Sequence, residues 1–163
     1  MTFTDPTDVS HWRPLRLLLD AMDNDIARIY EEAEIEGLKP SYVMELIKLR
    51  VHGQMTIKEL AESVGRTHSA LSQKVAAMRK AGLVATTAGK DARSKEVVLT
   101  DRARGIIDRL AAEWRATEAA VAEIEAELPY PLTAVVRDIE EALRRRSFHD
   151  RIMAKLAADE AWQ

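Results

Sequence analysis

The side chains best suited to bind another molecule through hydrogen bonds lie between residues 68 and 81. A helix over this range would place Ser69, Gln73 and Lys80 on one face, half a turn away from its apolar positions. A glutamine can form two hydrogen bonds with the edge of an adenine, and a serine can bond to any base. Small neighbours such as Ala76 would let the helix backbone approach a surface closely. This face indicates recognition by hydrogen bonding, with packing against another helix as the alternative.

The same region is the basic part of an acidic chain. No Asp or Glu occurs among the 26 residues from Gly65 to Lys90, whereas 27 of the 163 residues of the chain are acidic. Residues 56–100 carry eight basic and four acidic side chains, and the segments before and after them are acidic on balance. Salt screens charges more than roughly 8 Å away, so the local balance decides which partner is attracted. The overall net charge of −3 is therefore compatible with a polyanionic partner such as nucleic acid.

The surrounding residues predict the elements that hold this face in place. Thr56 and Glu59 have the spacing of a capping box, which begins a short helix, and Thr67 can cap the next helix. Gly82 then ends that second helix. Two runs rich in β-branched residues, LVATTA and KEVVLT, predict a pair of strands joined by the loop GKDARS. This order of elements is that of a helix-turn-helix followed by a β-hairpin wing.

The loop of the predicted wing is basic. Lys90, Arg93 and Lys95 lie there around a single acid, Asp91. An arginine in a narrow minor groove meets a strong negative potential, whereas lysines mostly neutralise phosphates. The alternative interpretation is a solvated basic hairpin without a partner.

A long helix is predicted before this unit. It begins at Pro14 and is expected to end at Gly37, and its apolar residues recur at steps of three and four positions. These residues are more numerous than one covering layer needs, so they form either a core face or a subunit interface. A second helix is expected between Pro40 and Gly53, with Val51 on its buried side.

Two further helices are predicted at the C-terminal end. Thr100 can cap a helix that runs to about Leu128. The segment Pro129–Pro131 forms a rigid turn, because proline disfavours helical conformation in the residue before it. The last helix is expected from about Thr133 toward Ala161.

Several classes of function have no support in the sequence. There is no cysteine, and the four histidines lack the spacing of metal ligands. Neither a P-loop, a Gly-rich dinucleotide turn, a zinc-protease motif nor a nucleophile elbow occurs. We therefore expect no enzyme, no cofactor and no metal site. The absence of a long apolar run and of a signal-peptide core favours a cytoplasmic location.

The run DARSKEVVLT resembles the wing signature of the MarR-type (multiple antibiotic resistance regulator) winged helix-turn-helix transcription factors. In that family an Asp-x-Arg pair leads through a strand to Leu-Thr, the cap of a long helix. Upstream, LAESVGRTHSALSQKVAAMRKAGLV is similar to the family's helix-turn-helix in length and apolar positions. One departure is Ala103, where the family often has glycine.

The resemblance implies a mainly α-helical winged-helix fold and a homodimer formed through the terminal helices. The fourth helix would enter the major groove, with Ser69, Ala70 and Gln73 at base-facing positions. Arg93 would be the wing-tip arginine, oriented by Asp91. The family also implies a pseudo-palindromic operator, repression, and release by a small aromatic or phenolic effector bound between the dimer helices and the DNA-binding lobes.

These considerations define the expected organisation and site. The regions are an N-terminal arm and dimerisation helix (1–38), a winged helix-turn-helix DNA-binding lobe (39–100) and a C-terminal helical dimerisation hairpin (101–163). The residues expected to bind DNA are Thr67, Ser69, Ala70, Ser72, Gln73, Lys74, Lys80, Lys90, Asp91, Arg93 and Lys95. Those expected around an effector are Trp12, Tyr30, Met44, His52 and Trp114. The alternative function is a winged-helix adaptor that binds an acidic protein partner.

Overall fold

The computed structural model describes residues 5–89 and 95–162, which form two compact units. The first unit extends to Glu113 and the second begins at Trp114, within one continuous helix. Among the described residues, no helix is both long and apolar enough to cross a membrane. The three regions expected from the sequence are a functional division and stay a prediction.

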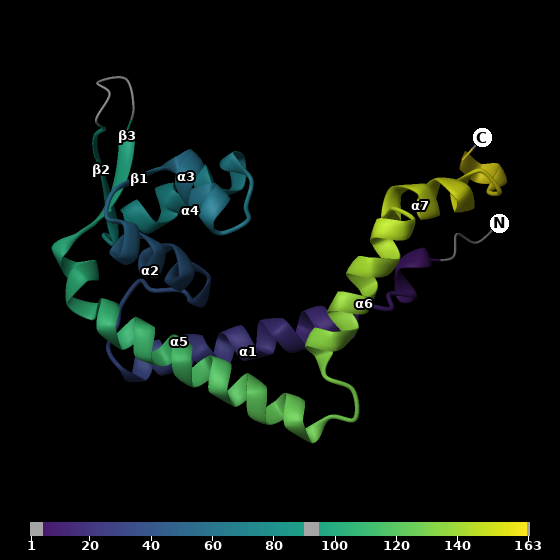
Figure 1. Cartoon of the computed structure of the whole chain (residues 1–163), viewed down its shortest axis with the longest axis horizontal. Coiled ribbons are helices and arrows are strands. Elements are labelled where there is room, and N and C mark those ends of the chain that lie inside the picture. Colours follow the sequence, from purple (N-terminus) through teal and green to yellow (C-terminus); the bar gives the residue numbers. More distant parts are fainter. Residues whose placement is uncertain (1–4, 90–94, 163) are drawn as a thin grey trace. The chain divides into compact units, whose positions relative to one another are not determined.

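The first unit contains the helix-turn-helix and the β-hairpin that the sequence predicts (Figure 1). The two helices of the helix-turn-helix lie next to a small sheet. In chain order its elements are η1 (Pro6–Asp8), α1 (Arg13–Glu32), η2 (Pro40–Tyr42), α2 (Val43–His52), β1 (Met55–Thr56), α3 (Ile57–Ser63), α4 (His68–Lys80), β2 (Val84–Ala88), β3 (Lys95–Leu99) and the beginning of α5 (Asp101–Glu127).

The sheet is antiparallel, in the order β1-β3-β2. Strand β2 pairs with β3 from Val84 opposite Leu99 to Ala88 opposite Lys95, so the two strands form the predicted hairpin. The two-residue strand β1 pairs with the other side of β3, where Met55 faces Val97. A strand this short leaves no periodic pattern in the sequence, and it was not predicted.

The core of the first unit lies between α2, α3, α4, the sheet and the beginning of α5. Its central side chains are leucine, methionine and valine, and their burial supplies the main driving force for packing these elements. The large side chains with 0% exposure are Leu46, Leu60, Leu71, Met78, Leu83, Val97 and Leu110.

Helix α1 ends earlier than the sequence predicts. The helix was expected to reach Gly37, but it ends at Glu32, and Glu34 adopts the left-handed conformation with φ 55°. The backbone N–H of Ile35 donates to the Tyr30 carbonyl at 2.8 Å, as in a Schellman C-cap. The side chains of Tyr30 and Ile35 are both buried, so hydrophobic packing stabilises this early end.

Helix α2 buries its apolar side around Leu46, but the expected burial of Val51 is wrong. Val51 was placed on the buried side, but it is 70% exposed, whereas Leu49 is 1% exposed. The reason is that the buried face is centred on Leu46 and Leu49, and Val51 lies about 200° around the helix from Leu49.

The second unit is a run of helices, in which the predicted last helix is divided. Helix α6 (Leu132–Arg145) is followed by Arg146, whose backbone is extended. Ser147 then caps α7 (Phe148–Leu156) by accepting a hydrogen bond from the Asp150 N–H. A short turn, η3 (Glu160–Trp162), follows. The expected continuous helix to Ala161 is therefore wrong, because the capping serine begins a new helix.

Candidate nucleic-acid interface

Helix α4 is held against the core by its apolar face. Leu71 and Met78 are 0% exposed and Val75 is 5% exposed, which confirms the predicted inward face. At its beginning, the Thr67 Oγ1 accepts a hydrogen bond from the Ala70 N–H at 3.2 Å, and this confirms the predicted cap. The cap and the buried face together fix where α4 begins and which side it turns outward.

The outward side of α4 carries the predicted hydrogen-bonding residues. Ser69, Gln73 and Lys80 are exposed, as are the small residues Ala70 and Ala76 between them. Ser72 lies beside this face and is half-buried. Polar groups alternate here with alanine, so the helix backbone is accessible to a flat or grooved surface.

Lys74 does not belong to this outward side. Its Nζ donates to Glu45 Oε1 at 2.6 Å and to the Ser41 carbonyl at 2.8 Å, and its side chain is 22% exposed. The ammonium group is thus directed toward α2, away from the face formed by Ser69 and Gln73. Lys74 is therefore not part of the surface that the outward side of α4 presents.

The β-hairpin contributes one described cation, Lys95, which is exposed at the beginning of β3. Lys90, Asp91 and Arg93 lie outside the described residues, so the predicted wing tip stays a prediction. An additional cation, Arg66, is exposed in the turn between α3 and α4. Arg66 was not among the predicted residues, although it belongs to the same acid-free span.

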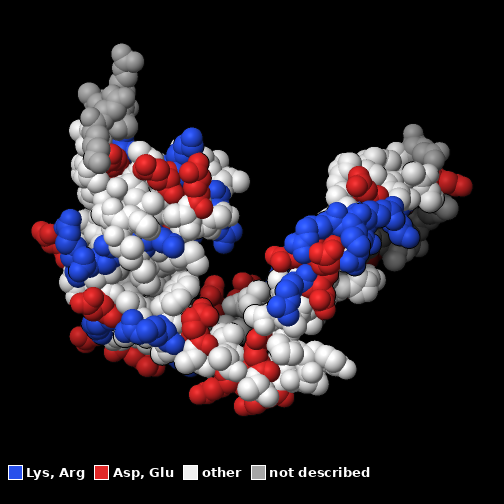
Figure 2. All heavy atoms as spheres, viewed as in Figure 1, with Lys and Arg blue, Asp and Glu red and all other residues white. Residues whose placement is uncertain are grey.

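Basic side chains also gather on the second unit. Figure 2 shows them along α6 and α7. Arg144 and Arg145 lie 2.5 and 3.4 Å from the carboxylate of Glu141, one helical turn earlier. Such pairs are typical of a solvated helix face.

The residues expected around an effector are not brought together in the first unit. Trp12 precedes α1 and Tyr30 lies near its other end, about 27 Å away at 1.5 Å per residue. Met44 and His52 are exposed on α2, and Trp114 belongs to the second unit. The five residues stay a prediction for an effector site, and within one unit they do not form a pocket.

Tyr30 has a structural role instead. It is 2% exposed, and its hydroxyl donates to Glu113 Oε2 at 2.6 Å, which joins α1 to α5. Burial, together with this hydrogen bond to a carboxylate, raises the pKa of Tyr30. The phenol is therefore neutral and acts as a donor.

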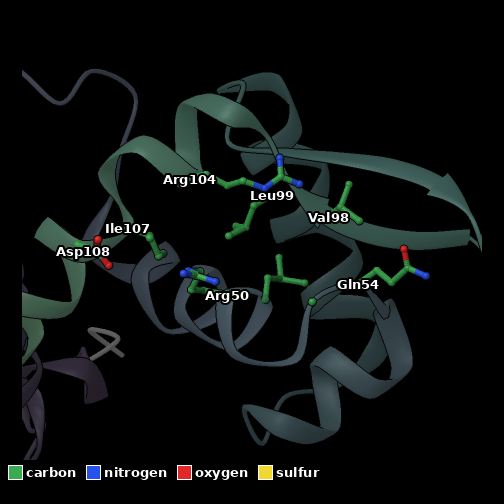
Figure 3. A pocket seen from close by; sticks show the side chains of 9 residues that line it. Arg50, Gln54, Val98, Leu99, Arg104, Ile107 and Asp108 are labelled. Atoms are coloured by element: carbon green, nitrogen blue, oxygen red, sulfur yellow. The ribbon is translucent and has the colours of Figure 1, made fainter.

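A hollow of about 400 Å³ lies between α2, β3 and α5 (Figure 3). Apolar side chains line part of it, and Arg50 from α2 and Arg104 from α5 lie at its sides. None of the five expected effector residues lines this hollow. Its lining residues are Leu49, Arg50, Gly53, Gln54, Val98, Leu99, Arg104, Ile107 and Asp108.

Metal ligands are not grouped in the part of the chain that the structure describes. There, no three histidine, aspartate or glutamate side chains are close enough together to hold an ion.

The arrangement of α3, α4 and the β2–β3 hairpin defines a winged helix-turn-helix protein. A family model described as HVO_A0114 matches residues 42–106, which is the lobe containing these elements. Comparison with curated protein sequences gives no match.

Solved structures extend the similarity to most of the chain. The MOSR transcriptional regulator from M. tuberculosis in complex with DNA is 25% identical, with a TM-score of 0.59, and the match covers 84% of this chain and 96% of that one. The MepR–DNA complex from S. aureus is 14% identical, with a TM-score of 0.61, and the match covers 84% and 98%. AbsC, a MarR family transcriptional regulator from Streptomyces coelicolor, is 20% identical, with a TM-score of 0.55, and covers 93% and 99%. This chain has the winged-helix fold of the MarR-type regulators, as the sequence resemblance predicts.

Proposed function

We propose that this protein is a homodimeric regulator of transcription that binds double-stranded DNA in a sequence-specific manner and acts as a repressor. The observation that carries the proposal is the outward face of α4. It presents Ser69, Gln73 and Lys80 between alanines, within a span that has no acidic residue. A helix of this kind can enter a major groove without repelling the phosphates on either side.

The two DNA complexes among the similar structures support this proposal. MOSR and MepR were both solved with DNA, and each is matched over nearly its whole length.

Within the proposed interface, the residues divide into two groups. Ser69, Ala70 and Gln73 would contact base edges, where Gln73 pairs best with adenine. The others would position the protein by contacting phosphates or the minor groove. They are Thr67, Ser72, Lys80 and Lys95, with Lys90 and Arg93 expected from the sequence and Asp91 expected to orient Arg93.

Exposed apolar side chains support dimerisation. Of the α1 residues expected to form an apolar face, Leu18 is 55% and Ile29 is 49% exposed, and the neighbouring Leu17 is 61% exposed. In the second unit, Val136 of α6 and Phe148 of α7 are 46% and 66% exposed. A second copy of the chain would bury such surfaces. A dimer with two-fold symmetry requires half-sites about one helical turn apart.

Release by a small aromatic or phenolic effector is part of the same proposal. An effector shifts the equilibrium between two states of the dimer only if it binds one of them more tightly. Loss of operator binding on addition of a candidate compound, in a titration against a fixed operator, would identify such an effector.

Selection of bound sequences from random duplex DNA tests the proposed function. We expect a pseudo-palindromic motif, and binding to it that weakens steeply as salt increases while keeping its preference over a scrambled duplex. An adaptor for an acidic protein would show salt-sensitive binding without sequence preference. Recovery of no common motif would therefore contradict the proposal and favour the adaptor.

A further inference from the structure

One ion pair in the first unit is buried behind the proposed recognition helix. The Glu45 side chain of α2 is 2% exposed, and its Oε1 lies 2.6 Å from the Nζ of Lys74 on α4. The same ammonium group donates to the Ser41 carbonyl at 2.8 Å, in the turn before α2. Lys74 is thus held at two points, one in η2 and one in α2.

The pair is not explained by stability alone. Within the described residues, Glu45 Oε2 is buried and has no hydrogen-bond partner, so the carboxylate depends on Lys74 for its compensation. Removing a carboxylate from water costs free energy that one ion pair does not always return. Apolar side chains of similar size at both positions often give a structure that is as stable or more so.

We propose that the Glu45–Lys74 pair is a positioning device, which fixes the rotation of α4 about its axis and thereby the direction of Ser69 and Gln73. This inference rests on the proposed function. The apolar face of α4 resists displacement from the core, but nonpolar packing is weakly directional. An ammonium group held by two acceptors is directional, and it is next to Gln73 in the sequence.

The geometry of a helix shows why a small rotation matters. Side-chain atoms lie about 5–6 Å from the helix axis, so a rotation of about 10° moves them by about 1 Å. Hydrogen bonds to a base edge need donor–acceptor distances of about 2.7–3.2 Å, and a shift of 1 Å breaks them. Contacts to phosphates through the long Lys80 side chain tolerate such a shift. The pair should therefore affect sequence preference more than overall affinity for DNA.

The test compares binding to the selected duplex and to a scrambled duplex of the same composition, over a series of salt concentrations. In the double variant Glu45→Met with Lys74→Met, no charge remains buried. We expect it to fold and to lose about tenfold or more of its preference, which corresponds to about 1.4 kcal/mol. Its salt dependence on the scrambled duplex should equal that of the parent, because Lys74 contacts no phosphate.

Lys80→Met is the matched control, since Lys80 is an exposed cation on the same helix. It should weaken binding to both duplexes alike and reduce the salt slope by about 1. Glu45→Gln is a milder variant, which keeps the size of the side chain and should reduce the preference by a smaller factor without changing the slope. If the double variant does not fold, the preference of Glu45→Gln for the selected duplex over the scrambled duplex tests the inference instead.

The possible outcomes separate this inference from the proposed function. If the parent prefers the selected duplex and both Glu45 variants keep the same preference, the inference is overturned and the proposed function stands. A salt slope that falls by about 1 in the double variant would overturn it too, because Lys74 would then be a phosphate contact. A parent without any preference between the duplexes would overturn both.

Discussion

Replacing Lys74 alone with methionine should reduce the free energy of unfolding by about 3–5 kcal/mol. The reason is the carboxylate that remains. Glu45 is 2% exposed, and within the described residues only Lys74 compensates its charge. A buried charge that loses its partner costs more than the pair itself contributes.

The opposite replacement, Glu45→Met, should cost less. The Lys74 side chain is 22% exposed and keeps its hydrogen bond to the Ser41 carbonyl, so the ammonium group can be hydrated. We expect a loss of about 1.5–3 kcal/mol, as for one hydrogen bond to a charged group. The double variant should lie within about 1 kcal/mol of the parent, because neither charge is then buried.

Urea unfolding followed by circular dichroism measures these differences, at one protein concentration because a dimer is stabilised by association. With a slope of about 2 kcal/mol per molar urea, Lys74→Met should lower the midpoint by about 1.5–2.5 M. Arg28→Met is the control, since it breaks an exposed pair with Asp25 of 3.1 Å and should change stability by less than about 1 kcal/mol. A double variant as unstable as Lys74→Met would refute the reasoning, because packing at position 74 would then be the cause.

Three further predictions concern the interface and the second unit. Gln73→Ala should relax base preference at one operator position, and an unchanged motif in a repeated selection would contradict this. Arg93→Ala should weaken operator binding by about 1–3 kcal/mol without unfolding the protein, as measured by titration at fixed salt. In the second unit, hydrogen bonds from the backbone and hydroxyl of Thr133 lower the pKa of Glu125. The ionised carboxylate therefore stabilises the α5–α6 turn at pH values above the ordinary pKa of a glutamate, and this contribution is lost as the pH falls through the lower folded pKa. The difference in melting temperature between Glu125→Gln and the parent should thus vanish in acid, and a difference that stays constant would exclude this role.

The elements around α4 could be predicted because their signals are local. Thr56 and Glu59 form the expected capping box, with the Thr56 N–H donating to Glu59 Oε2 at 2.8 Å. Thr67 likewise caps α4 from three residues away. Within one helical turn, a side chain competes with few alternatives, so residue type and spacing are sufficient.

Other features depend on tertiary packing and left no clear signal. Glu34 is a non-glycine residue in the left-handed region, where the buried Ile35 ends α1 before the expected Gly37. The contact between Glu45 and Lys74 joins residues that are 29 positions apart. One hint existed, because Glu45 lies beside Leu46 on the apolar side of α2, and a charge placed there requires a partner.

The placement of Glu45 also satisfies two requirements of the recognition helix. Lys74 must be oriented, and no acidic side chain may lie close to the phosphates. An acidic residue on α4 itself could orient Lys74, but it would bring a negative charge close to the phosphates and weaken binding at low and moderate salt. An acid from α2 avoids this cost, because it is buried behind the helix and its charge is balanced by Lys74 at 2.6 Å. The absence of acids from residues 65–90 and the burial of one acid outside that span are thus two parts of one arrangement. On this argument, moving the acid onto the helix surface, as in Ala76→Glu, should weaken binding to specific and scrambled duplexes alike, whereas loss of Glu45 should affect mainly the preference between them.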